Sequence, residues 1–180
     1  MSEPRVVGLD LSLTATGVAP SRFPQLRIAY TITTKKRGCD RLAHIRDEVM
    51  KSCAPVEVWD PEWRMDAPLV VLEGYAYGRP NQAAHLGELG GVIRLALHEA
   101  GVPYVDVPPS NLKKYATGKG NAGKEEVLAA AIRRLGYEGH DNNQADALWL
   151  QAMGYDALGC PLVAMPESHR AALVKVEWPS

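Results

Sequence analysis

The sequence Val6-Val7-Gly8-Leu9-Asp10 is an apolar run that ends on a carboxylate, near the start of a chain of 180 residues. Short runs of valine and leucine are typical of strands that are buried on both faces of a sheet. A carboxylate in such a place is costly unless a cation or hydrogen bonds compensate its charge. Asp10 is therefore either a structural acid in a turn or a ligand of a metal ion.

A second apolar run, Leu69-Val70-Val71-Leu72, ends in the same way, on Glu73. Two strands that each end in an acid indicate carboxylates that meet at one edge of a sheet. Like charges tolerate each other there when a cation lies between them. The sequence therefore favours a metal site where these two strands end.

The order of the predicted elements defines an α/β fold. The first strand and the segments 17–19 and 26–33 predict a three-strand antiparallel meander, and strands at 69–73 and 102–107 flank a helix in a βαβ unit. We expect a central mixed five-stranded sheet, with the meander and two parallel strands, flanked by helices. Helical spacing of apolar residues predicts these helices over 39–53, 81–100, 110–115, 122–135 and 141–154. Residues 1–160 are expected to form one domain, and residues 161–180 a peripheral tail.

Three glycines interrupt the predicted helix over 81–100, namely Gly87, Gly90 and Gly91. Glycine lowers helix propensity, so its presence indicates a place where another backbone comes close. We therefore expect a close contact on that side of the helix.

The bulk composition excludes some classes of protein. The formal net charge of -1 argues against a generally basic nucleic-acid binder, although acids and bases can still gather at one site. The three cysteines lack metal-ligand spacing, which fits a reducing compartment and argues against a zinc site. No apolar stretch has the length of a transmembrane helix, and no signal peptide is recognisable, so we expect an intracellular protein without a membrane partner.

A third acid, Asp146, lies in the predicted helix over 141–154, at the border of its apolar face. Asn143 lies one turn earlier, and Asp141 and Gln144 have the spacing of a capping box. Asp141 is thus either only a helix cap or a further ligand, and Asn143 is a candidate ligand. Two strand acids with oxygen ligands from a helix suit magnesium or manganese.

The glycine-rich loop before Lys124 contains a literal G-x-x-x-x-G-K string, from Gly118 to Lys124. A P-loop would need serine or threonine next, where this chain has Glu125, and an apolar strand before the loop. The alternative is a loop that opens a helix and holds a backbone phosphate through lysine side chains. The lysines in question are Lys113, Lys114, Lys119 and Lys124. A solvated basic loop explains the same composition.

The loop after Glu73 carries Tyr75, Tyr77 and Arg79. Tyrosines beside an acidic site can stack on unpaired bases. Packing of one tyrosine into the core is the alternative interpretation.

Four segments together resemble the RuvC-like Holliday-junction resolvases of the ribonuclease-H-like superfamily. They read GLDLSLTATGVA, VVLEGYAYGRPNQAAHLGELGGVI, PPSNLKKYATGKGNAGKEEV and NNQADALWLQAMG. The acids of the family correspond to Asp10, Glu73 and Asp146, and its basic positions to Lys113 and Lys124. This chain departs from the family at Asn143, where a fourth acid is expected. It also has Ala76 in place of the base-stacking aromatic, and it looks like a divergent, phage-type member.

The resemblance implies a magnesium-dependent endonuclease, with manganese as a substitute, that cuts branched DNA. Four-way junctions are the first expected substrate, and flaps or forks are wider ones. Asp10, Glu73 and Asp146 would hold two ions, and Lys124 would stabilise the charge on the reacting phosphate. The resemblance further implies a homodimer in the bacterial cytoplasm, without a nucleotide cofactor.

Two other readings stay open. A DNA-binding module that has lost catalysis would explain Asn143. An actin-like ATPase or a sugar kinase would explain an acid followed by Ser12 and Thr14, but those folds need two such domains, and 180 residues are too few.

Overall fold

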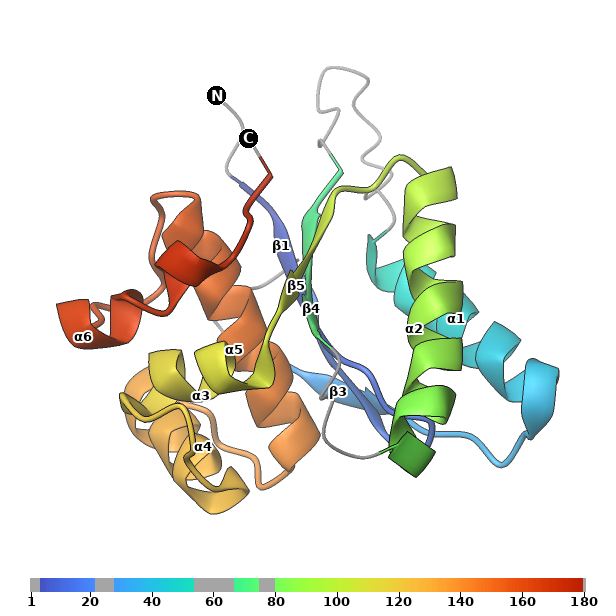
Figure 1. Cartoon of the computed structure of the whole chain (residues 1–180), viewed down its shortest axis with the longest axis horizontal. Helices are drawn as coiled ribbons and strands as arrows, with labels where there is room; N and C mark the ends of the chain where they lie inside the picture. Colours follow the sequence, from blue (N-terminus) through green and yellow to red (C-terminus); the bar gives the residue numbers. More distant parts are fainter. Residues whose placement is uncertain (1–3, 22–27, 54–66, 75–79, 180) are drawn as a thin grey trace.

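A central sheet separates two helical layers in a computed structural model of the chain (Figure 1). The structure describes residues 4–21, 28–53, 67–74 and 80–179. Its strands are β1 (Val6–Asp10), β2 (Thr16–Ala19), β3 (Tyr30–Ile32), β4 (Leu69–Glu73) and β5 (Tyr104–Val107). Its main helices are α1 (Gly38–Cys53), α2 (Pro80–Glu99), α3 (Pro109–Thr117), α4 (Lys124–Ala130) and α5 (Asn142–Ala157).

The sheet has the order β3-β2-β1-β4-β5. The pairs β1–β2 and β2–β3 are antiparallel, whereas β1–β4 and β4–β5 are parallel. Helix α2 connects the parallel strands β4 and β5. The predicted meander, the βαβ unit and the mixed five-stranded sheet are therefore confirmed.

Two element boundaries differ from the sequence prediction. The strand expected over 26–33 is only Tyr30–Ile32 in its described part, because it is an edge strand whose first residue is exposed to solvent. The helix expected over 122–135 begins at Lys124 and changes at Ala131 into a π-helical turn that ends at Leu135. Gly136 then adopts a left-handed conformation with φ of 69°, which ends the helix as expected.

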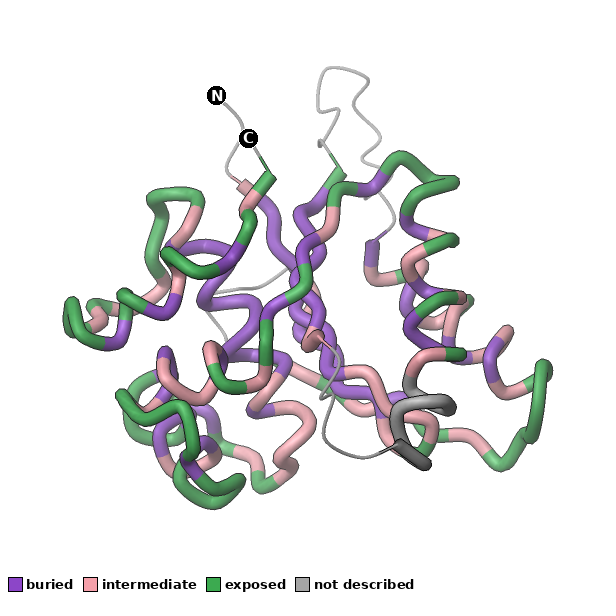
Figure 2. The backbone as a smooth tube through the Cα atoms, in the orientation of Figure 1, coloured by how far each residue is buried: buried purple, intermediate pink, exposed green. Residues whose placement is uncertain are grey.

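Alternation along β1 divides the core into two clusters. Val6 packs with the helical layer of α3, α4 and α5, whereas Val7 and Leu9 pack with the layer of α1 and α2. Figure 2 shows that burial is concentrated in the strands and in α5. The same period of two directs Asp10, like Val6, toward the α5 side of the sheet.

Helix α5 packs against the sheet backbone at two strand glycines. A Cβ atom added to Gly8 would lie 1.9 Å from the carbonyl oxygen of Ala147, and one added to Gly17 would lie 2.1 Å from that of Asn143. By contrast, added Cβ atoms at Gly87 and Gly91 of α2 would meet nothing within 4 Å. The close contact expected at those two α2 glycines was therefore wrong, because both face open space.

The C-terminal segment 161–178 lies against α3 and α5 (Figure 1). It contains the short helix α6 (Glu167–Arg170) and the 3-10 turn η3 (Leu173–Lys175). His169, Ala172 and Val176 of this segment are buried. The division into a domain and a tail stays a prediction. Within the described ranges, no helix has the length and apolar character needed to cross a membrane.

Candidate active site

A pocket of about 430 Å³ opens where β1 and β4 end. It lies between the sheet edge and the α3, α4 and α5 layer. All three acids singled out in the sequence line it, together with two of the lysines. Its described lining consists of Asp10, Leu11, Ser12, Leu13, Thr14, Glu73, Pro109, Leu112, Lys113, Lys124, Val127, Asn143 and Asp146.

Strand register brings the two strand acids together. The parallel pairing of Leu9 with Leu72 places the next residues, Asp10 and Glu73, side by side at the ends of adjacent strands. Both side chains lie on the α5 face, because alternation assigns them the side of Val6 and Val71. Asp146 reaches the same pocket from α5. The pocket therefore contains the carboxylates that the sequence predicts at one edge of the sheet.

The carboxyl groups of Asp10 and Glu73 share a hydrogen bond. A proton shared in such a bond would relieve the repulsion between the two carboxyl groups. Burial, followed by the charges of Glu73 and Asp146, raises the pKa of Asp10 well above its ordinary value. Burial also raises the pKa of Glu73, against the opposing effects of its bond to Asp10 and of nearby lysines.

Asp146 is affected in the same direction. Burial, and then the charge of Glu73, raises its pKa to about 7, while the cations of Lys124 and Lys113 lower it. The three acids therefore lie in a place that disfavours their charged forms. This is the electrostatic pattern expected of a functional site rather than of a solvated surface.

Lys113 of α3 and Lys124, the first residue of α4, form the basic wall of the pocket. Both lysines act electrostatically on the acids. Lys114 does not line the pocket within the described residues. Lys119 lies in a separate groove, where its Nζ atom is 3.6 Å from Glu126 Oε1. Of the four predicted phosphate-binding lysines, the pocket therefore brings together Lys113 and Lys124.

The structure separates the two candidate helix ligands. Asn143 lines the pocket, whereas Asp141 is the N-cap of α5. Asp141 Oδ1 accepts hydrogen bonds from the backbone amides of Asn143 at 2.8 Å and of Gln144 at 3.4 Å. Asp141 Oδ2 accepts from Thr31 Oγ1 at 2.6 Å. Both oxygens of Asp141 thus accept hydrogen bonds, one from the first turn of α5 and one from Thr31. Metal binding by Asn143 or Asp141 stays a prediction.

A polar network around this cap was not predicted. Tyr137 Oη donates to Gln144 Oε1 at 2.8 Å, and Gln144 Nε2 donates to Thr31 Oγ1 at 3.0 Å. Gln144 therefore bonds to β3 and to Tyr137 and does not complete a capping box. The network ties the first turn of α5 to the edge strand, and this fixes the helix that carries Asp146. No sequence spacing links Thr31 with Tyr137, so only the fold shows their role.

The turn after Asp10, which the sequence analysis considered only for the ATPase or sugar-kinase reading, also belongs to the pocket. Ser12 and Thr14 line the pocket. Thr16 Oγ1 donates to the carbonyl of Ser12 at 2.6 Å and accepts from its amide at 3.1 Å, which fixes the turn. Hydroxyl residues directly after a strand acid were the available signal.

The remaining predicted site features fall elsewhere. The loop before Lys124 follows helix α3, not a strand, so the structure agrees with the rejection of a P-loop. Tyr75, Tyr77 and Arg79 lie outside the described residues.

The donor chemistry of the pocket fits a hard divalent cation. Its acids offer only oxygen atoms. Burial, and then mutual repulsion, raises the pKa values of Asp10 and Asp146, and a bound cation would oppose both effects. As they stand, however, no three histidine, cysteine, aspartate or glutamate side chains in the described part of the chain form a cluster that could hold an ion. The residues therefore fit a metal site by type and by location, and ligation would require them to close around the ion.

Several known proteins are similar to this chain in sequence. The chain is 31% identical, over 102 residues, to the crossover junction endodeoxyribonuclease RuvC of Synechococcus sp. (strain WH7803), a match that spans 56% of this chain and 62% of that relative. It is 27% identical to the RuvC of Synechococcus sp. (strain CC9605), over 82% of this chain and 99% of that one. No protein-family model matches the chain.

The fold has a solved counterpart. The structure of Thermus thermophilus RuvC in complex with a Holliday junction substrate superimposes with a TM-score of 0.63, at 23% identity, over 91% of this chain and 100% of that one. The similarity in sequence covers nearly all of one relative, and the similarity in fold covers the sheet and both helical layers. The chain is therefore similar in sequence to RuvC endonucleases over most of its length, and it has the ribonuclease-H-like fold of Thermus thermophilus RuvC.

Proposed function

We propose that this protein is a metal-dependent endonuclease that hydrolyses phosphodiester bonds in branched DNA, with four-way junctions as its main substrate. The observation that carries the proposal is the pocket in which Asp10, Glu73 and Asp146 meet Lys113 and Lys124. Relatives named as crossover junction endodeoxyribonucleases support the same reaction. Flaps and forks are candidate wider substrates.

The residues present suit two magnesium ions, with manganese as a substitute. Asp10, Glu73 and Asp146 would hold them, and Asn143 is the further oxygen ligand that lines the pocket. When bound, such ions activate a water molecule and stabilise the leaving oxygen.

The protein side chains have separate tasks in this reaction. To hold a cation the three carboxyl groups must be ionised, against the burial and mutual repulsion that raise the pKa values of Asp10 and Asp146. Lys113 and Lys124 face them and stabilise the negative charge that develops on the phosphate. Ser12 and Thr14, at the pocket rim beside Asp10, are positioned to contact the DNA backbone.

The working form in this proposal is a homodimer. A four-way junction presents two equivalent strands for cutting, and a twofold pair of sites matches that symmetry. An intracellular, DNA-processing role in recombination or repair follows from the same substrate.

The competing function is a module that binds branched DNA without cutting it. Asn143, which stands in the family's acidic position, is the feature that motivates it. The three acids and two lysines that line one pocket favour the enzyme. A nucleotide-binding ATPase or kinase is disfavoured by the helix that precedes the glycine-rich loop, where a P-loop would need a strand.

The test is cleavage of an end-labelled four-way junction in magnesium, with a flap, a fork and a linear duplex in parallel. We expect cuts in the junction, loss of cutting on chelation, and little cutting of the duplex. Asp10→Asn and Asp146→Asn should each lower the cleavage rate by about 10³-fold or more while junction binding is kept. Binding without cleavage in the wild type would establish the binding module instead.

A further inference from the structure

A partly buried ion pair joins the C-terminal segment 161–178 to α5. The side chain of Asp156 is 0% exposed, and its partner Arg170 is 53% exposed. Arg170 Nη2 donates to Asp156 Oδ1 at 2.8 Å, and Arg170 Nε lies 3.1 Å from both carboxylate oxygens. Tyr115 Oη donates to Asp156 Oδ2 at 2.9 Å. The contact therefore links three elements, because Tyr115 belongs to α3.

The same segment also holds the end of α3. His169 Nδ1 donates to the backbone carbonyl of Tyr115 at 2.7 Å, since a carbonyl oxygen can only accept. The imidazole lies against Gly118, where an added Cβ atom would be 2.9 Å from His169 Nε2. Near the other end of α3, Asn111 Nδ2 donates to the carbonyl of Ala172 at 2.8 Å. Segment 161–178 thus contacts α3 near both of its ends.

Helix α3 is the element that carries Lys113 into the pocket. A helix of nine residues is unstable alone, so its position depends on what it packs against. Gly118, which touches His169, is also the left-handed C-cap of α3, with φ of 85°. The loop that begins there leads to Lys124 at the start of α4. Both lysines of the pocket therefore depend on elements that segment 161–178 contacts.

Segment 161–178 itself does not reach the pocket: none of its residues is among the described pocket lining. Its polar contacts to α3 are made by Asn111, Tyr115 and the C-terminal end of the helix. Any effect of this segment on chemistry must therefore pass through α3 and the loop after it.

We propose that segment 161–178 is a brace for the basic wall of the active site, in which Arg170 and His169 act through α3 as positioning residues for Lys113 and Lys124. The inference rests on the proposed endonuclease function. It also assigns a task to the stretch that the sequence presents as a peripheral tail.

The main test is Arg170→Ala, with the cleavage rate measured at saturating junction and expressed per binding-competent site. Because the lysines act on the transition state, we expect a fall in kcat of about 10-fold. The Kd for the junction, measured in an Asp10→Asn background, should change by less than about 3-fold. Arg170→Lys keeps the charge but loses the bidentate hydrogen bonding to Asp156, and it should recover part of the cleavage rate. Amide hydrogen exchange of residues 109–124 should become faster in Arg170→Ala.

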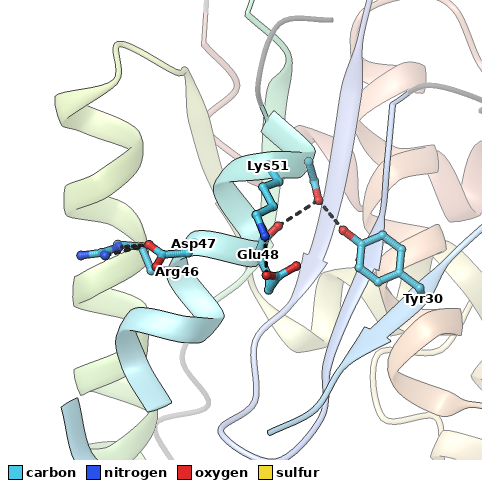
Figure 3. Close-up of polar contacts among 6 residues, drawn as sticks. Tyr30, Arg46, Asp47, Glu48 and Lys51 are labelled. Atoms are coloured by element: carbon cyan, nitrogen blue, oxygen red, sulfur yellow. Dashed lines mark hydrogen bonds and ion pairs between the residues drawn. The ribbon is translucent and has the colours of Figure 1, made fainter. Parts of the chain in front are cut away.

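Two further variants distinguish the loss of the brace from a general failure to fold. Asp156→Asn with Arg170→Leu removes the ion pair without leaving a buried charge, and should show the same fall in kcat. The matched control is Arg46→Ala on α1, where Arg46 forms an exposed pair with Asp47 on the opposite side of the sheet (Figure 3). This control should keep both the cleavage rate and the exchange of residues 109–124.

The outcomes separate the two proposals. A wild type that binds but never cuts overturns the proposed function, while hydrogen exchange still reports whether segment 161–178 holds α3. A folded double variant with the wild-type kcat and unchanged exchange overturns the brace. A lower kcat with nearly unchanged Kd, together with faster exchange confined to α3 and its loop, supports it.

Discussion

The two faces of the sheet are built from different chemistry. On the side of α1 and α2 the buried cluster contains no carboxyl group, and Cys53 is its one titratable member among the described residues. Polar pairs such as Arg46–Asp47 and Lys51–Glu48 lie on the surface (Figure 3). On the side of α3, α4 and α5, ionisable groups are buried within the fold. Burying a polar group costs free energy unless it has partners. The second face therefore contains groups that need a specific reason to be there.

Two buried acids on that face differ in how they are compensated. Asp156 accepts hydrogen bonds from Tyr115 and Arg170. Asp10 instead faces Glu73 and Asp146, and these charges add to burial in raising its pKa. An acid with donors around it serves the fold, whereas an acid surrounded by acids serves chemistry that needs a cation. The contrast separates structural from functional carboxylates within one helical layer.

The largest expected effect tests how the two faces are packed. Gly8→Ala would place a Cβ atom 1.9 Å from the Ala147 carbonyl, so α5 must move away from the sheet. We expect a loss of about 3 kcal/mol or more in the free energy of unfolding. Gly91→Ala in α2 meets no atom within 4 Å and should stabilise the protein by about 0.5–1 kcal/mol. Urea unfolding of both variants measures the difference, and equal effects would mean that α5 does not pack as described.

This packing also marks the limit of what the sequence predicts. The strands, the meander and the parallel pair follow from apolar runs and their order, because a buried strand leaves a period of two or a continuous run. Gly87 and Gly91 were misread, since a helix glycine and a strand glycine look alike in one dimension. Only the register that sets Gly8 beneath Ala147 shows which of them the fold requires.

The candidate site, like the fold, was predictable only in part from the sequence. Asp10, Glu73 and Asp146 could be found because each stands at the end of an apolar strand or at the border of an apolar helix face. The local spacing allowed Asp141 to be a cap, but its second bond, to Thr31, comes from a residue 110 positions away in the sequence. The contacts of His169 and Arg170 with α3 and α5 leave no periodic signal either. Such long-range partners exist only once the chain has folded.

The second expected effect concerns the basic wall on the functional face. Lys124→Ala should lower the cleavage rate of a four-way junction by about 10²-fold, equivalent to about 2.7 kcal/mol, because one donor to the developing charge is lost. Junction affinity should fall far less. Lys119→Ala, at a lysine paired with Glu126 outside the pocket, is the matched control and should cut at nearly the wild-type rate. If both lysines matter equally for the rate, the loop acts as a general DNA contact.

The third prediction uses the raised pKa of Asp146, about 7 against an ordinary 3.8. The folded state then binds the proton more tightly than the unfolded state, so folding loses stability as the pH rises from about 4 to about 7. Without metal at pH 8, Asp146→Asn should therefore be more stable than the wild type by about 1–3 kcal/mol. The two should be nearly equal near pH 3.5.

Thermal unfolding at both pH values, with chelator and then with magnesium, measures this difference. Magnesium at pH 8 should stabilise the wild type more than the variant, because the variant lacks one carboxylate ligand. A variant that is less stable than the wild type at pH 8 without metal would show that Asp146 is a satisfied structural acid like Asp156.

The smallest expected effect distinguishes the two residues at the start of α5. Asn143 lines the pocket and offers a neutral carbonyl oxygen, whereas the carboxylate of Asp141 is occupied by the amides of the first turn and by Thr31. A carboxylate holds a divalent cation more tightly than an amide oxygen does. Asn143→Asp should therefore lower the magnesium concentration for half-maximal cleavage by several-fold. Asp141→Asn should leave it unchanged, because asparagine caps helices nearly as well.

A magnesium titration of the cleavage rate in both variants decides between these residues, and unfolding without metal supplies an independent measurement. Asn143→Asp adds a fourth charge to a pocket whose acids already repel one another, so the metal-free variant should be less stable than the wild type at pH 8. Magnesium should remove that difference, because the cation compensates the added charge. If Asp141→Asn instead raises the magnesium requirement strongly and Asn143→Asp brings no gain, then α5 must rearrange when metal binds. Asp141 would then leave its capping bonds to become the fourth ligand, and the first turn of α5 would be a mobile part of the active site rather than a fixed one.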